Sequence, residues 1–181
     1  MKPVDRVLTA GLVIGPVIYL IADILYAVRG WDDPTAAIFH VLGSIGYALA
    51  LLRVVSWSEG WMAATLLVVG MIGVAGSVAY GFNTIHVSLG DTDLVGASGA
   101  ANLIKPLGLF FPLAFLLCAV ALRRTRPAWL VVTLAVAAAA WPVAHIANIA
   151  WLAVAVNVAL VAGFGALIPI AAPDRKTAVV N

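Results

Sequence analysis

Asp23 and His40 are ionisable residues that stand inside long apolar stretches of the sequence. An ionisable side chain is costly in lipid, so each of these residues is a candidate functional residue by default. A carboxyl group and an imidazole at one site can exchange protons with a bound molecule as acid and base. The sequence therefore predicts that Asp23 and His40 are a catalytic or ligand-binding pair.

Other polar and aromatic residues share a helical face with these two, at spacings of three and four residues. They are Tyr19 and Tyr26 around Asp23, and Ser44 and Tyr47 after His40. Further candidates lie near the corresponding ends of other apolar stretches, namely Ser77, Tyr80, Lys105, His145, Asn148 and Trp151. We expect all of these side chains to line one polar pocket.

The histidines allow two kinds of cofactor. His40 and His145 could hold a b-type haem between them, and the three histidines together with Asp23 could hold zinc or copper. No spacing motif supports either alternative, so no metal ligand is assigned and the cofactor is left open. Cys118 is the only cysteine, which excludes an internal disulfide and CxxC redox chemistry.

The composition defines the elements that must position these residues. Of 181 residues, 64% are hydrophobic and 10% are charged, and the mean hydropathy is +1.11. Soluble domains have a charged share of roughly 25%. The sequence thus predicts an all-α, polytopic integral membrane protein whose first partner is the lipid bilayer. A net charge of +2, with basic residues in short clusters, argues against nucleic acid as a partner.

We predict six transmembrane helices in a single transmembrane domain covering residues 1–181. The expected spans are 8–28, 35–56, 61–82, 101–122, 127–145 and 147–169, with residues 83–100 as an outward loop or cap. The last two spans divide one apolar stretch that is about twice as long as a bilayer core of ~30 Å requires. Because Trp141-Pro142 is the only cluster near its middle that contains a helix-breaking residue, we expect the hairpin there.

Basic residues predict the orientation. Lys2, Arg6, Arg53, Arg123, Arg124, Arg126, Arg175 and Lys176 fall on one side of the predicted membrane, and only Arg29 and Lys105 fall on the other. By the positive-inside rule both termini are cytoplasmic, in a multi-pass protein of the cell (cytoplasmic) membrane. The polar pocket would then open outward and be lined by the first, second, third and sixth helices.

Asp23 and His40 are also predicted to touch. Each lies six residues from the nearest end of its helix, at a depth of roughly 9 Å by helix rise. The two helices are joined by a short turn and run antiparallel, so they should pack against each other. Asn157 is expected to be an interhelical hydrogen-bonding residue and not a ligand.

Gly11 and Gly15 form a GxxxG motif in the first span. Small residues at this spacing let two helices approach closely, and a homo-oligomer is one interpretation of the motif.

The function we expect is the binding or conversion of a hydrophobic or amphiphilic small molecule, such as an isoprenoid, quinone or lipid, by intramembrane acid-base chemistry. The alternatives are a proton-coupled small-molecule transporter, a b-haem or metal-binding membrane protein, and an accessory subunit of a larger membrane complex. A transporter is disfavoured because polar residues crowd one half of the helices and the other half is apolar. Whether the protein is an enzyme is not decided by the sequence.

Overall fold

The computed structural model describes residues 2–168, and these residues form six α-helices and no strands. The elements are α1 (Pro3–Arg29), α2 (Pro34–Ser56), α3 (Gly60–Ser88), the short 3₁₀ helix η1 (Gly99–Leu103), α4 (Ile104–Leu122), α5 (Ala128–Ile146) and α6 (Ala150–Gly165). This confirms the predicted all-α fold.

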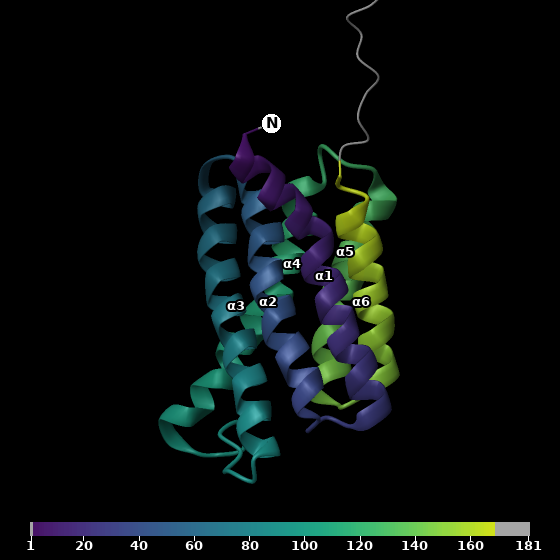
Figure 1. Cartoon of the computed structure of the whole chain (residues 1–181). Helices are drawn as coiled ribbons and strands as arrows, with labels where there is room; N and C mark the ends of the chain where they lie inside the picture. The colour runs from purple at the N-terminus through teal and green to yellow at the C-terminus, as the bar shows by residue number, and fades with distance from the viewer. Residues whose placement is uncertain (1, 169–181) are drawn as a thin grey trace, which may run out of the picture.

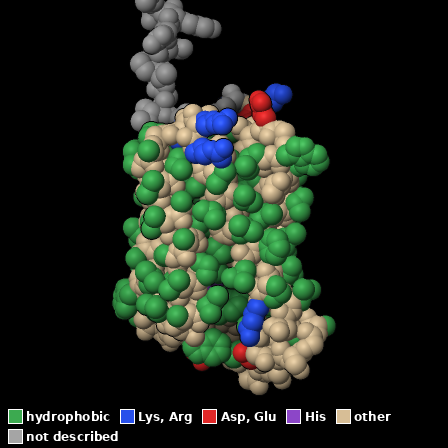
Figure 2. All heavy atoms as spheres, turned by 180° about the vertical axis from the view of Figure 1, so that it is seen from behind, with side chains coloured by type: hydrophobic (Ala, Val, Ile, Leu, Met, Phe, Trp, Pro, Cys, Tyr) green, Lys and Arg blue, Asp and Glu red, His purple; other side chains and the backbone are tan. Residues whose placement is uncertain are grey.

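Five of the six helices are long and apolar enough to cross a membrane, and α6 is a shorter apolar helix of 16 residues. Figure 2 shows one face of the bundle, on which hydrophobic side chains cover the middle and charged side chains lie at the two ends. Such a surface is suited to lipid and not to water. The described part of the chain is therefore a helical membrane bundle.

The helices form a closed ring in which neighbours in sequence pack side by side and α6 returns to α1 (Figure 1). Both ends of the bundle can be followed in Figure 1. The terminal end holds the start of α1, the α2–α3 turn, the α4–α5 turn and the end of α6. The loop end holds the α1–α2 turn, the α3–α4 loop and the α5–α6 turn.

Several helix ends differ from the prediction, among them the start of α6, which is Ala150 instead of residue 147. Helix α3 continues past residue 82 to Ser88, so the α3–α4 connection starts later than expected. Helix α5 ends at Ile146, one residue past the predicted end of the fifth span. It continues through Pro142, however, so the predicted hairpin at Trp141 and Pro142 is wrong. A proline inside a membrane helix is tolerated because neighbouring groups satisfy the freed carbonyl.

The chain turns between α5 and α6 around Asn148, whose φ of 54° is a left-handed conformation that asparagine adopts more readily than most residues. The predicted end of the sixth span at residue 169 lies outside the described residues.

The GxxxG motif of α1 packs against α2 of the same chain. A Cβ atom on Gly15 would collide with the backbone of Gly46 and Tyr47, and one on Gly11 would collide with Leu49. The motif therefore explains how two neighbouring helices approach closely within one chain. A homo-oligomer stays a prediction.

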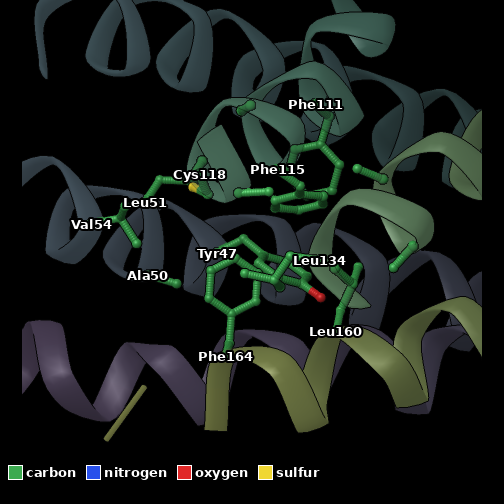
Figure 3. Close-up of a cluster of buried hydrophobic side chains, with 14 of the residues drawn as sticks. Tyr47, Ala50, Leu51, Val54, Phe111, Phe115, Cys118, Leu134, Leu160 and Phe164 are labelled. Atoms are coloured by element: carbon green, nitrogen blue, oxygen red, sulfur yellow. The ribbon is translucent and has the colours of Figure 1, made fainter. Parts of the chain in front are cut away.

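Aromatic rings fill the core between the two ends. Tyr47 is fully buried and contacts Phe111, Phe115 and Phe164, whose ring centroids lie 5.4, 4.8 and 5.9 Å from its own (Figure 3). Around them lie buried aliphatic side chains and the Cys118 thiol. This apolar layer separates the loop end from the terminal end.

The terminal end carries an ion pair between α1 and α2. Arg53 Nη1 donates a hydrogen bond of 2.9 Å to Asp5 Oδ1. The guanidinium groups of Arg53 and Arg126 lie over the Trp57 ring, 4.9 and 5.2 Å from its centroid. These cation–π contacts hold basic groups at the edge of the apolar surface.

The α3–α4 loop is ordered by one side chain of α3. Asn83 Nδ2 donates to Asp93 Oδ1 at 2.9 Å, and the Leu94 amide donates to Asn83 Oδ1 at 2.7 Å. The Val95 amide also donates to Asp93 Oδ1, at 2.9 Å. These bonds tie the loop to the end of α3 as a cap.

The cap should loosen in acid. The hydrogen bond from Asn83, followed by the backbone donors, lowers the pKa of Asp93 below that of a free aspartate. A depressed folded pKa gives stability that is present above the unfolded pKa and is lost as pH falls through the folded value. We expect the hydrogen-exchange protection factors of the Leu94 and Val95 amides to fall over that range. Asp93→Asn should lower the same protection factors at neutral pH, and Asp91→Asn is the control. Unchanged protection in Asp93→Asn would show that Asp93 does not hold the cap.

Candidate functional site

The polar candidates meet at a small cavity in the loop end of the bundle. Its volume is about 40 Å³, and its wall is built by α1, α2, α3 and the end of α5. The lining residues are Ala22, Asp23, Tyr26, Trp31, Ala36, Ala37, His40, Tyr80, Thr84, His145 and Asn148. The sixth helix was expected in this wall, but His145 belongs to the last turn of α5 and Asn148 to the turn that follows it.

Asp23 is the most buried carboxyl group at this end among the described residues, with 2% of its surface exposed. Its Oδ2 accepts a hydrogen bond of 2.6 Å from Asn157 Nδ2 on α6. Its Oδ1 lies 3.4 Å from His145 Nε2 on α5. Both oxygens of the carboxyl group are thus engaged by helices that are distant in sequence.

The predicted contact between Asp23 and His40 is therefore wrong. The two residues do lie at the same end of the bundle, where both line the cavity. However, α1 packs against α6 as well as α2, and Asp23 faces the partners on α5 and α6. Tyr19, one turn earlier on α1, occupies the place next to His40, with ring centroids 4.6 Å apart.

The hydrogen bonds of His145 define where its protons are. Nδ1 lies 3.0 Å from the backbone oxygen of Trp141, and a carbonyl oxygen only accepts, so Nδ1 must carry a hydrogen. A bare Nε2 facing a bare carboxylate oxygen of Asp23 would be repulsive. One proton must therefore lie between Nε2 and Oδ1, on either atom. In both forms the Asp23–His145 pair carries no net charge.

Aromatic stacking keeps His145 in this position. The Trp141 ring lies parallel to the imidazole, with ring centroids 4.0 Å apart and an interplanar angle of 18°. Trp141 itself is buried. The residue expected at the hairpin is thus part of the support of the site.

His40 is held by a second set of partners. Its Nε2 lies 3.1 Å from both the backbone oxygen and Oγ of Ser77, and 3.3 Å from the Tyr19 hydroxyl. The backbone oxygen requires Nε2 to carry a hydrogen. Nδ1 has no hydrogen-bond partner among residues 2–168. It is also not one of the fully buried, unpartnered side-chain atoms, so part of its surface is accessible. His40 thus lines the cavity and keeps one ring nitrogen that is neither hydrogen-bonded within residues 2–168 nor fully sealed.

Four of the predicted pocket residues lie behind the wall of the cavity, fully or almost fully buried: Tyr19, Ser44, Tyr47 and Ser77. Ser44 Oγ and Ser77 Oγ are 2.9 Å apart, behind His40. The Tyr47 hydroxyl donates to Asn157 Oδ1 at 3.0 Å, and Asn157 in turn donates to Asp23. These residues position the groups that line the cavity.

Two predicted pocket residues are not brought to the cavity. Trp151 is 66% exposed on α6, and Lys105 is exposed near the start of α4. Neither lines the cavity. The remaining candidates, Tyr26, Tyr80 and Asn148, do line it, and the Tyr26 hydroxyl donates to Asn148 Oδ1 at 3.4 Å.

Asn157 is the interhelical hydrogen-bonding residue that the sequence predicted, since it bonds Asp23 on α1 and Tyr47 on α2. Its place beside Asp23 was not predicted, and neither was the lining residue Trp31. A sixth span that starts at residue 147 would place Asn157 roughly 15 Å from that end, deeper than Asp23. Since α6 starts at Ala150, Asn157 lies roughly 10 Å from that end, which is the depth of Asp23. Equal depth is the signal that could have paired the two residues.

The site does not fit a b-type haem. A cavity of about 40 Å³ is far smaller than a haem macrocycle. In addition, Nε2 of His40 and Nε2 of His145 are each already hydrogen-bonded. Within residues 2–168, no group of three or more His, Cys, Asp or Glu side chains is arranged to hold a metal ion.

In comparisons with known proteins, the chain matches no protein-family model, no curated protein and no solved structure.

Proposed function

We propose that this protein binds the polar head of a hydrophobic or amphiphilic small molecule in the cavity at the loop end and acts on it by acid-base chemistry. The observation that carries the proposal is the Asp23 carboxyl group, which is buried, lines the cavity and is held by His145 and Asn157. A buried carboxyl group in a membrane protein is costly unless it has a function or a structural partner. Here it has partners and also faces a cavity.

The size of the cavity limits what can enter. A water molecule needs at least about 10–15 Å³, whereas pockets for whole drug-sized ligands measure about 300–1,000 Å³. A cavity of about 40 Å³ accepts a head group of a few atoms. The rest of the molecule would lie outside, against exposed apolar side chains such as Val28 on α1, Trp31 in the α1–α2 turn and Ile38 on α2.

The cavity offers both a proton donor and a proton acceptor. The Asp23–His145 pair holds a proton between Oδ1 and Nε2, and His40 Nδ1 has a free lone pair when the ring is neutral. A head group placed between them could receive a proton from one side and lose one to the other. Asn157, Trp141 and Ser77 position these groups without touching the ligand.

A transporter is less well supported. The hydrogen-bonded chain from the cavity runs through Asp23 and Asn157 to Tyr47. There it meets the Phe111, Phe115 and Phe164 rings. A carrier needs a polar path that can open to both sides.

We also propose that the loop end faces outward, because most basic residues lie at the terminal end. Cysteines introduced at Asp33 and Gly96 should then react with a membrane-impermeant maleimide on intact cells, and a cysteine at Arg124 should not. Cys118 is buried and gives a low background. Labelling at Arg124 alone would reverse the orientation.

The binding proposal can be tested by what the protein retains when membranes are extracted directly into nanodiscs. We expect mass spectrometry to find one amphiphile enriched with the wild type and with Asp91→Asn, an exposed acidic control at the same end. Asp23→Asn should retain about a tenth of it or less, since the loss of a charge-linked hydrogen bond costs about 1.5–3 kcal/mol. Equal retention by Asp23→Asn, or no enriched amphiphile in the wild type, would contradict the proposal.

A further inference from the structure

We infer that the head group bound at this site is uncharged and carries a hydroxyl group, as in a long-chain alcohol. The inference rests on the proposed function and adds the chemical class of the ligand. It follows from two properties of the cavity, the sum of its charges and the arrangement of its donors and acceptors.

The charges of the lining residues cancel. The Asp23–His145 pair is neutral in both of its protonation forms, because its one shared proton lies between Oδ1 and Nε2. His40 is almost fully buried and makes no hydrogen bond to a carboxylate among the described residues, so its neutral form is favoured. The other lining side chains, those of Tyr26, Tyr80 and Asn148 among them, are uncharged.

Charged residues elsewhere at the loop end do not reach the cavity. Arg29 Nη1 lies 3.8 Å from Asp33 Oδ2 on the surface of the α1–α2 turn. His86 Nδ1 lies 3.3 Å from Asp91 Oδ2 on the cap. Lys105 is exposed on α4 and is not a lining residue. A phosphate, carboxylate or ammonium head would therefore be buried without a counter-ion, which is strongly unfavourable.

The hydrogen-bonding groups select among uncharged heads. His40 Nδ1 in its neutral form can only accept a hydrogen bond, since Nε2 carries the hydrogen that goes to the Ser77 carbonyl. The proton between Asp23 and His145 can be donated to the ligand. A hydroxyl group both donates and accepts, so it satisfies both sides of the cavity. An ether or ester oxygen only accepts and would leave His40 Nδ1 without a partner.

The inference can be tested with a set of lipids that share one alkyl chain and differ only in the head. The full-length protein in nanodiscs is labelled by a photoreactive long-chain alcohol, and unlabelled alcohol, methyl ether, fatty acid and alkylamine compete at neutral pH. We expect the alcohol to compete at concentrations about tenfold lower than each of the others, the difference that one unsatisfied buried group produces. In His40→Ala the advantage of the alcohol over the methyl ether should disappear, and in Asp91→Asn it should remain.

The outcomes separate this inference from the proposed function. Stronger competition by the fatty acid or the alkylamine, or equal competition by the methyl ether, would overturn the hydroxyl head while leaving an amphiphile-binding site in place. No saturable labelling and no competition by any of the four lipids would overturn both.

Discussion

Replacing Asp23 with alanine is expected to lower the free energy of unfolding in detergent by about 3–5 kcal/mol, and His145→Ala should have a comparable effect. Each change removes one partner of a buried pair and leaves the other without the group that shares its proton. The double variant should be less destabilised than the sum of the two single variants. In a double-mutant cycle we expect a coupling energy above about 0.5 kcal/mol.

The same cycle between Asp23 and His40 is the internal control. Nε2 of His40 is bonded to Ser77 and Tyr19 and makes no hydrogen bond to Asp23. The coupling energy between Asp23 and His40, which share only the cavity, should therefore be smaller than that between Asp23 and His145. Coupling between Asp23 and His40, together with additivity between Asp23 and His145, would contradict the arrangement of the site.

Replacing Gly15 with leucine is expected to destabilise the bundle by about 3 kcal/mol or more, at the upper end of the usual cost of overpacking. The added side chain would collide with the backbone of Gly46 and Tyr47, which cannot move aside as a flexible side chain could. Because the close contact of α1 and α2 holds Tyr19 beside His40, ligand binding at the loop end should be lost as well. Unfolding in detergent and the lipid competition measure the two effects.

Gly108→Ala is the matched control for this substitution. Gly108 also lies within an apolar helix, but a Cβ atom added there meets no atom within 4 Å. The change should be neutral or should raise stability by about 0.5–1 kcal/mol, because alanine favours the helix more than glycine does. If Gly15→Leu left the monomer stable and only dissociated an oligomer, the motif would serve contacts between chains and not the α1–α2 contact.

Much of the architecture could be predicted from the sequence, because membrane helices follow from local properties. Apolar stretches of sufficient length, separated by charged and polar turns, define six helices and their approximate ends. The end at which polar residues gather could be predicted in the same way. Asp23, Tyr26, His40, Tyr80, His145 and Asn148 all line the one cavity at that end.

The partners of these residues were decided only by the tertiary structure. Depth along a helix follows from residue number, but the direction of a side chain depends on how its helix is rotated and which helices surround it. The backbone contact between Gly15 and Gly46 sets α1 against α2, and α6 then closes the ring on the other side of α1. Asp23 consequently meets His145 and Asn157, residues more than a hundred positions away. Spacing along the sequence gives the depth of each residue, but packing between distant segments determines which residues at that depth meet.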